Sequence, residues 1–98
     1  MPDDGDVDAR AAVFNALGNP VRLRILLTLM ATTRPLHIKA VADRLALDYA
    51  GVYRHVQLLT RAGLLDVYEV GRSRVLALRH AATLRELIAK ARDVAPST

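Results

Sequence analysis

The side chains best suited to chemistry in this sequence are hydrogen-bonding groups concentrated between residues 44 and 74. An arginine guanidinium can bond guanine O6 and N7 together, and a glutamine amide can bond adenine N6 and N7. Arg54 and Gln57, three positions apart, supply both groups to one side of a predicted helix. The candidate base-reading set is Tyr49, Ala50, Gly51, Tyr53, Arg54 and Gln57. The pattern predicts a helix that reads double-stranded DNA in the major groove.

A second group of arginines could contact the DNA backbone. Arg72 and Arg74 flank Ser73 at the tip of a predicted hairpin, where two guanidinium groups suit a minor groove or its phosphates. Arg44 and Arg61, near the ends of two predicted helices, are further candidates for phosphate contacts. Alternatively, the hairpin tip is a solvated turn, and Arg54 and the tyrosines merely cover the domain surface.

Hydrophobic periodicity predicts the elements that position these side chains. Helices are expected over about Val7 to Leu17, Pro20 to about Thr32, Ile38 to Leu45, Tyr49 to Ala62 and Ala81 to near Val94, and strands over Leu65–Val70 and Ser73–Arg79. Asn19 and Asp48 are predicted helix N-caps, and Gly63 a left-handed helix end. The recognition helix should bury Val52, Val56 and Leu59.

This order, ααααββα, predicts a mainly α (α+β) winged helix-turn-helix fold with a two-stranded wing. Because a lone hairpin is only marginally stable, the wing must pack against the helices. We expect residues 1–98 to form one domain, with frayed ends at 1–5 and 95–98 and a dimerisation helix over 80–94. The alternative is an all-helical domain that carries an incidental hairpin.

The charge distribution favours a nucleic-acid partner. From residue 10 onward, fourteen Lys and Arg oppose six acidic residues, and twelve of the fourteen are Arg. No apolar run is long enough for a membrane span, and the acidic start MPDDGDVD lacks the pattern of a signal peptide. We therefore expect a cytoplasmic, nucleoid-associated protein with no membrane partner.

Three segments resemble the ArsR/SmtB family of winged helix-turn-helix regulators. They are NPVRLRILLTL at Asn19–Leu29, ADRLALDYAGVYRHVQLLTRAGLL, and the VGRSR wing, within a resemblance that runs from Phe14 to Arg79. Other winged-helix families share the RAGLL exit and the wing. The resemblance implies a homodimeric transcriptional repressor whose outer helices form the dimer interface.

The sequence departs from the metal-sensing members of that family. His37 and Lys39, followed by Ala40, occupy positions where those members carry a Cys-x-Cys pair, and a protonated lysine cannot bind a metal. In the last helix, His80 and Glu86 are six residues apart and do not share a face. The chain has no cysteine. We therefore expect no metal site, no cofactor and no small-molecule effector.

Apolar stripes on the first and last predicted helices indicate a dimer. The three inner helices should already supply the core, which leaves the terminal stripes free to pair with a second copy. The candidate dimer residues are Val7, Phe14, Leu17, Leu84, Leu87, Ile88 and Ala91. Two recognition helices placed about 34 Å apart would match an inverted-repeat operator.

The sequence contains no pattern typical of an enzyme. Ser73 and Ser97 have no nearby histidine, GxxxxGK is absent, and the acidic run Asp3, Asp4, Asp6 and Asp8 lacks the spacing of a calcium loop. We expect a sequence-specific DNA-binding transcriptional regulator. The alternatives are a non-specific nucleoid-type protein and a winged-helix adaptor that binds another protein.

Overall fold

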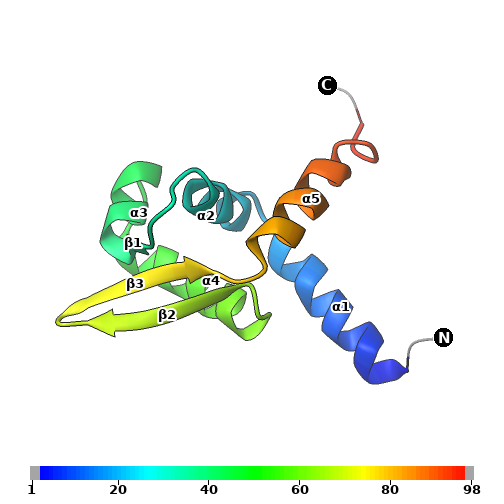
Figure 1. Ribbon diagram of the computed structural model, residues 1–98, viewed down its shortest axis with the longest axis horizontal. Coiled ribbons are helices and arrows are strands. Elements are labelled where there is room, and N and C mark those ends of the chain that lie inside the picture. Colours follow the sequence, from blue (N-terminus) through cyan, green and yellow to red (C-terminus); the bar gives the residue numbers. More distant parts are fainter. Residues whose placement is uncertain (1–2, 97–98) are drawn as a thin grey trace.

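The structure, a computed structural model, describes residues 3–96. Along this range the elements are α1 (Asp4–Leu17), α2 (Pro20–Met30), β1 (Leu36–His37), α3 (Ile38–Leu45), α4 (Tyr49–Arg61), β2 (Leu65–Val70), β3 (Ser73–Leu78) and α5 (Ala81–Ala91). Figure 1 shows the β2–β3 hairpin projecting on one side of the molecule and α1 and α5 extending on the other. The predicted winged helix-turn-helix fold is confirmed.

Helix α1 begins earlier than predicted. The Asp3 carboxylate accepts a hydrogen bond of 2.9 Å from the Asp6 amide and caps the helix, which starts at Asp4 rather than near Val7. The capping bond satisfies an amide that the helix itself cannot pair. The prediction of a frayed start was therefore wrong for residues 3–5. Residues 1–2 and 97–98, also predicted to fray, lie outside the described residues.

The corner between α1 and α2 is held by side chains that bond backbone groups. Asn19 accepts from the amides of Val21 and Arg22, at 2.8 and 3.1 Å, which confirms its capping role. Arg22 donates to the carbonyls of Ala16 and Asn15, at 2.7 and 2.9 Å. Both carbonyls belong to the last turn of α1, where helix geometry leaves carbonyls without a regular partner, although the Asn15 carbonyl also accepts from the Gly18 amide at 3.2 Å. Arg22 therefore fixes how α1 leaves the core.

Both helices of the helix-turn-helix end in a left-handed residue. After α4, Gly63 has φ +85°, and the Leu64 amide donates to the Leu59 carbonyl at 3.0 Å, as predicted for this glycine. After α3, the left-handed position is occupied by Ala46, with φ 56°, and the Leu47 amide donates to the Ala42 carbonyl at 3.0 Å. An alanine in this conformation costs about 1–2 kcal/mol because its Cβ crowds the backbone.

Replacing Ala46 with glycine is expected to raise the free energy of unfolding by up to about 1 kcal/mol. Relief of left-handed strain of about 1–2 kcal/mol is partly offset by about 0.4–1 kcal/mol of extra unfolded-state entropy. Ala12→Gly, the same change at an exposed interior position of α1, should lower it by about 0.5–1 kcal/mol. Urea denaturation measures the free energy of unfolding of both variants. If both lose stability, the backbone at Ala46 is not strained as proposed.

The sheet contains one strand more than predicted. Its order is β1-β3-β2 with antiparallel pairing, and β1 places Leu36 opposite Leu76 and His37 opposite Val75. The wing hairpin, β2 and β3, turns at Gly71, which has φ +63°. The strand β1 ties the wing to the start of α3, because Ile38, the next residue, begins that helix.

One hydrophobic core holds the helices and the sheet together. Its largest fully buried side chains are Ile25, Leu26, Ile38, Val41, Val52, Val56, Leu59, Leu65 and Leu76. The outer helices also enter this core, since Ala16 of α1 is 0% exposed and Leu84 of α5 is 3% exposed. The sequence analysis assigned Leu84 to the dimer surface. That assignment was wrong, because Leu84 faces the protein's own core.

Helix α5 is shorter than the predicted dimerisation helix over residues 80–94. It runs from Ala81 to Ala91, after His80 in a left-handed conformation with φ 56°. Turns follow Ala91, including a hydrogen bond of 2.9 Å from the Ala95 amide to the Ala91 carbonyl. Val94, beyond the helix, is 88% exposed. The helix therefore presents Leu87, Ile88 and Ala91 in its last turns.

Candidate nucleic-acid interface

Helix α4 has one buried side and one polar, exposed side. Val52, Val56 and Leu59 are each 0% exposed, as predicted. The exposed residues of the same helix are Tyr49, Ala50, Arg54, Gln57 and Arg61. This division follows the helical period, since residues three or four positions apart share a side. The predicted base-reading side chains of Arg54 and Gln57 are therefore accessible, and the apolar side fixes the helix that carries them.

The two tyrosines of α4 form a cluster with an arginine of the wing. The rings of Tyr49 and Tyr53 stack with centroids 6.3 Å apart. The guanidinium carbon of Arg74 lies 4.4 Å from the centroid of the Tyr53 ring, and Nη1 donates to the Tyr49 hydroxyl at 3.3 Å. The hydrogen bond to Tyr49 is the main cause that raises the pKa of Arg74. A cation over an aromatic face is attracted by the ring quadrupole.

This cluster changes the interpretation of three predicted residues. Tyr53 is half-buried and packs against the core, so most of its ring is occupied within the protein. Arg74 bends back onto α4, whereas Arg72 at the tip of the wing is exposed. Arg74 therefore joins the wing to the recognition helix, and the exposed Arg72 has no side-chain partner within residues 3–96. A link between residues 25 positions apart was not visible in the sequence.

Gly51 has a role within the chain itself. A Cβ at this position would lie 2.6 Å from Oδ1 of Asp48, closer than side-chain atoms approach in proteins. The sequence analysis placed Gly51 in the candidate base-reading set. The Asp48 carboxylate, the flexible end of an exposed side chain, occupies this space, and the predicted DNA contact of Gly51 stays a prediction. Asp48 occupies the predicted N-cap position, but within the described residues its side chain makes no capping hydrogen bond.

Both outlying backbone candidates, Arg44 and Arg61, are exposed. Arg44 is exposed in the last turn of α3, shortly before the turn that leads into α4. Arg61 is also exposed but lies in the last turn of α4, about 18 Å along the helix from Tyr49 at a rise of 1.5 Å per residue. Arg44 therefore lies toward the N-terminal end of α4, whereas Arg61 lies near its C-terminal end, where it lines a hollow together with Tyr53 and Gln57.

His55 connects the recognition helix to the α1–α2 corner. Nη1 of Arg22 lies 3.3 Å from His55 Nδ1. Partial burial, followed by the positive charges of Arg22 and Arg54, lowers the pKa of His55 from its usual value near 6.5. The imidazole is therefore neutral at pH 7, and its Nδ1 can accept a hydrogen bond from Arg22. A contact across 33 residues leaves no local signal in the sequence.

Residues 3–96 contain no group of three or more His, Cys, Asp or Glu side chains arranged to hold a metal ion. None of the helices in this range has the length and apolar content needed to cross a membrane.

One protein-family model matches the helix-turn-helix segment. Residues 17–68, which include α2, α3 and α4, match the model of the family described as "Helix-turn-helix domain". The chain belongs to this family. It is a family of DNA-binding transcriptional regulators, not a family of enzymes. No curated protein sequence matches the chain significantly.

Solved structures share the fold. HlyU from Vibrio cholerae superimposes with a TM-score of 0.76 at 21% identity, over 91% of this chain and 97% of that one. The homodimeric winged helix-turn-helix DNA-binding domain Mb0332 from Mycobacterium bovis, a possible ArsR-family transcriptional regulator, gives a TM-score of 0.76 at 20% identity, over 99% and 96%. A transcriptional regulator homologue from Pyrococcus horikoshii gives 0.72 at 27% identity, over 82% and 84%. These likenesses confirm the predicted winged helix-turn-helix fold.

Proposed function

We propose that this helix-turn-helix protein is a homodimeric, sequence-specific repressor that binds an inverted-repeat operator in double-stranded DNA. The observation that carries the proposal is the two-sided character of α4. Three fully buried side chains anchor the helix, while Arg54 and Gln57 stand exposed on its other side. Both exposed groups are chemically suited to bidentate contacts with purines in the major groove.

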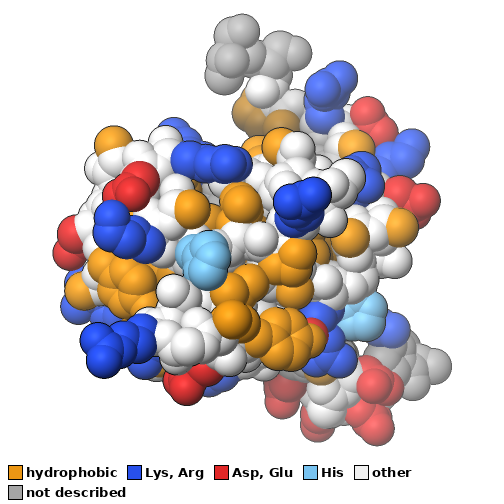
Figure 2. All heavy atoms as spheres, turned by 60° about the vertical axis from the view of Figure 1, so that its left-hand side comes forward, with side chains coloured by type: hydrophobic (Ala, Val, Ile, Leu, Met, Phe, Trp, Pro, Cys, Tyr) orange, Lys and Arg blue, Asp and Glu red, His pale blue; other side chains and the backbone are white. Residues whose placement is uncertain are grey.

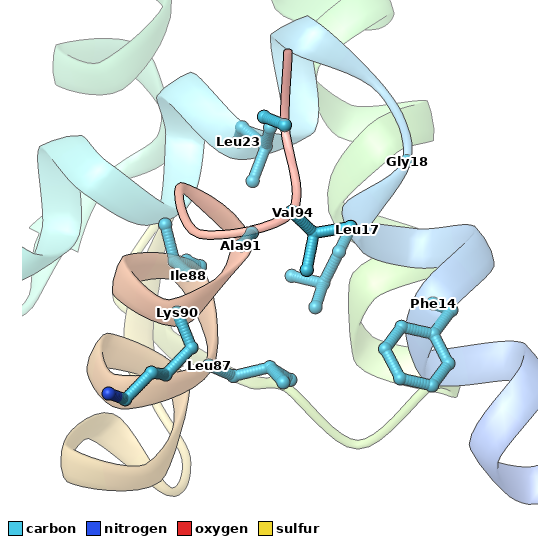
Figure 3. Close-up of a pocket in the computed structure, with 10 residues that line it drawn as sticks. Phe14, Leu17, Gly18, Leu23, Leu87, Ile88, Lys90, Ala91 and Val94 are labelled. Carbon is cyan, nitrogen blue, oxygen red and sulfur yellow. The ribbon is translucent and has the colours of Figure 1, made fainter. Parts of the chain in front are cut away.

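The groove between α1 and α5 supports a dimer. Its volume is about 620 Å³, and apolar residues from both helices line most of it. Figure 3 shows Phe14 and Leu87 pointing toward one another across the groove, while the Lys90 side chain points away from Phe14. Phe14, which lines the groove, is 60% exposed, and Val7 on the same helix is 52% exposed. A second copy would cover these residues.

A symmetric pair of chains explains how a small domain gains specificity. The proposed dimer surface consists of Val7, Phe14, Leu17, Leu87, Ile88 and Ala91. A two-fold axis at this surface presents two α4 helices to two half-sites about 34 Å apart. Binding at both half-sites multiplies the discrimination that each helix provides. The proposed place of action is the nucleoid in the cytoplasm.

Replacing Arg54 with alanine is expected to weaken operator binding by about 1–3 kcal/mol per half-site, or roughly 5- to 150-fold. The loss should concentrate on one base pair of each half-site, because a bidentate contact discriminates between bases. Operator DNA is first enriched from a randomised duplex pool with the wild-type protein. Fluorescence anisotropy then compares both proteins on this duplex and on its single-base variants.

Arg24→Ala provides the matched control, because Arg24 is an exposed arginine on α2 rather than α4. This variant should keep the base preference of the wild type. If enrichment from the pool yields no preferred sequence, and binding to all duplexes collapses with a steep salt slope, the protein is a nucleoid-type binder instead. Failure to bind any duplex would favour the protein adaptor.

A further inference from the structure

A basic hollow lies between the wing, the start of α3 and the start of α4. It has a volume of about 220 Å³ and is lined by His37, Lys39, Tyr49, Arg72, Ser73 and Arg74. A second hollow of about 260 Å³ shares the last four of these residues and adds Glu69 and Gly71. Neither His37 nor Lys39 belonged to the candidate DNA-binding residues. The strand β1 brings His37 here, since it pairs His37 with Val75 next to Arg74.

The lining of the first hollow favours an anion. Lys39, Arg72 and Arg74 carry positive charge, and no carboxylate among the described residues lines this hollow. The Asp43 carboxylate competes with an anion for the Lys39 ammonium, with Oδ2 of Asp43 3.5 Å from Nζ of Lys39. Their side chains are 81% and 70% exposed, so this pair contributes little and is easily exchanged for another partner. A bound anion can therefore recruit the Lys39 ammonium.

The same lining offers hydrogen-bond donors at fixed positions. The Tyr49 hydroxyl accepts a bond from Arg74 and keeps its own hydrogen for a ligand. Ser73 supplies a second hydroxyl. His37 occupies the N-cap position of α3, yet among the described residues its imidazole makes no capping hydrogen bond. Several donors around a positive hollow suit the multiple acceptor oxygens of a phosphate.

We propose that this hollow binds a phosphate group and that DNA supplies it from the backbone beside the groove occupied by α4. Lys39 and Arg72 neutralise the phosphate, and Ser73 and His37 donate hydrogen bonds to it. This inference rests on the proposed function, because α4 must enter the groove for the hollow to meet the backbone. Figure 2 shows the face turned forward from the left-hand side of Figure 1, where several Lys and Arg side chains lie among apolar ones and most Asp and Glu lie toward the edges.

The test is the salt dependence of DNA binding by Lys39→Gln. Each lost phosphate contact should reduce the slope of log K against log salt by about 0.9 per bound protomer. Affinity should fall by the same factor on operator and scrambled duplexes, because a phosphate contact carries no base preference. The matched control is Lys90→Gln. Lys90 forms an equivalent exposed pair with Asp93, with Nζ and Oδ2 3.9 Å apart, on the distant helix α5.

A second measurement identifies the source of the phosphate and stands apart from DNA binding. Inorganic phosphate is titrated into the ¹⁵N-labelled wild-type protein at constant ionic strength, with chloride as reference. The hollow is assigned to the DNA backbone if two results are found together. The salt slope of DNA binding is reduced in Lys39→Gln but not in Lys90→Gln, and phosphate causes no amide shifts beyond those caused by chloride. Shifts of the His37 and Ser73 amides at millimolar phosphate, together with release of DNA, assign it to a free phosphate.

The outcomes separate this inference from the proposed function. If the wild type binds no duplex but phosphate shifts the His37 and Ser73 amides, the DNA-binding function fails and the phosphate site stands. If Lys39→Gln and Lys90→Gln give the same slope and phosphate causes no more shift than chloride, the inference is overturned. Sequence-specific binding by the wild type would then leave the proposed function intact.

Discussion

Replacing Leu59 with alanine is expected to lower the free energy of unfolding by about 2–5 kcal/mol. Leu59 is 0% exposed and lies on the buried side of α4, among the largest side chains of the core. Truncation removes its transfer free energy and leaves a cavity that the surrounding side chains cannot fully close. In a domain of this size, each kcal/mol lowers Tm by about 4–8 °C, so the melting temperature should fall by roughly 8 °C or more.

Leu27→Ala is the matched control for this prediction. It makes the same chemical change within α2, but Leu27 is 48% exposed, and its truncation should change stability by no more than about 0.5 kcal/mol. Thermal and urea denaturation must be compared at one protein concentration, because a dimer's apparent stability depends on it. Equal effects of the two substitutions would show that Leu59 does not anchor α4 as described.

The features of the fold that could be predicted from the sequence are those set by local chemistry. Asn19 before Pro20 forms the predicted cap, because its side chain needs only the two amides that follow it. Gly63 ends α4 because glycine tolerates a positive φ, and the same local motif appears at Ala46. The start of α1 was placed too late because the apolar periodicity begins at Val7, while the capping aspartate lies four residues earlier.

The features that were missed depend on contacts between distant residues. The strand β1 contains only Leu36 and His37, too few residues for an alternating pattern, and exists because β3 lies beside it. Leu84 shares a stripe with Leu87 and Ile88, and only the packing of α5 separates the buried residue from the half-buried ones. Tyr53 and Arg74 were both predicted to meet DNA, but their contact with each other could not be seen in the sequence.

In the candidate interface, too, local features were predicted and contacts between distant residues were missed. The sequence predicted which side of α4 is exposed, because helical periodicity determines it once Val52, Val56 and Leu59 are buried. It could not show that Arg74 joins the wing to this helix or that Arg22 joins His55 to α1. Both arginines hold α4 in a fixed relation to neighbouring elements. The proposed reading of DNA therefore depends on residues that need not touch a base.

Replacing Phe14 with glutamate is expected to give a monomer and to weaken operator binding by about 100-fold or more. A carboxylate in the apolar groove between α1 and α5 would lose its hydration without gaining a partner, which strongly opposes dimer formation. Two linked binding sites exceed the affinity of one by about 10²–10⁴, and a monomer forfeits this gain. Because Phe14 is 60% exposed, the fold of the single chain should persist, with an unchanged circular dichroism spectrum.

Leu27→Glu distinguishes loss of the dimer from a general effect of an added charge. Leu27 is an exposed apolar residue on α2 and does not line the groove, so this variant should remain dimeric. Sedimentation velocity at micromolar concentration and anisotropy on one-half-site and two-half-site duplexes measure both proteins. The Phe14→Glu protein should bind both duplexes with similar affinity, whereas the wild type should prefer two half-sites. A dimeric Phe14→Glu protein with wild-type affinity would rule out the α1–α5 groove as the surface that brings two recognition helices together.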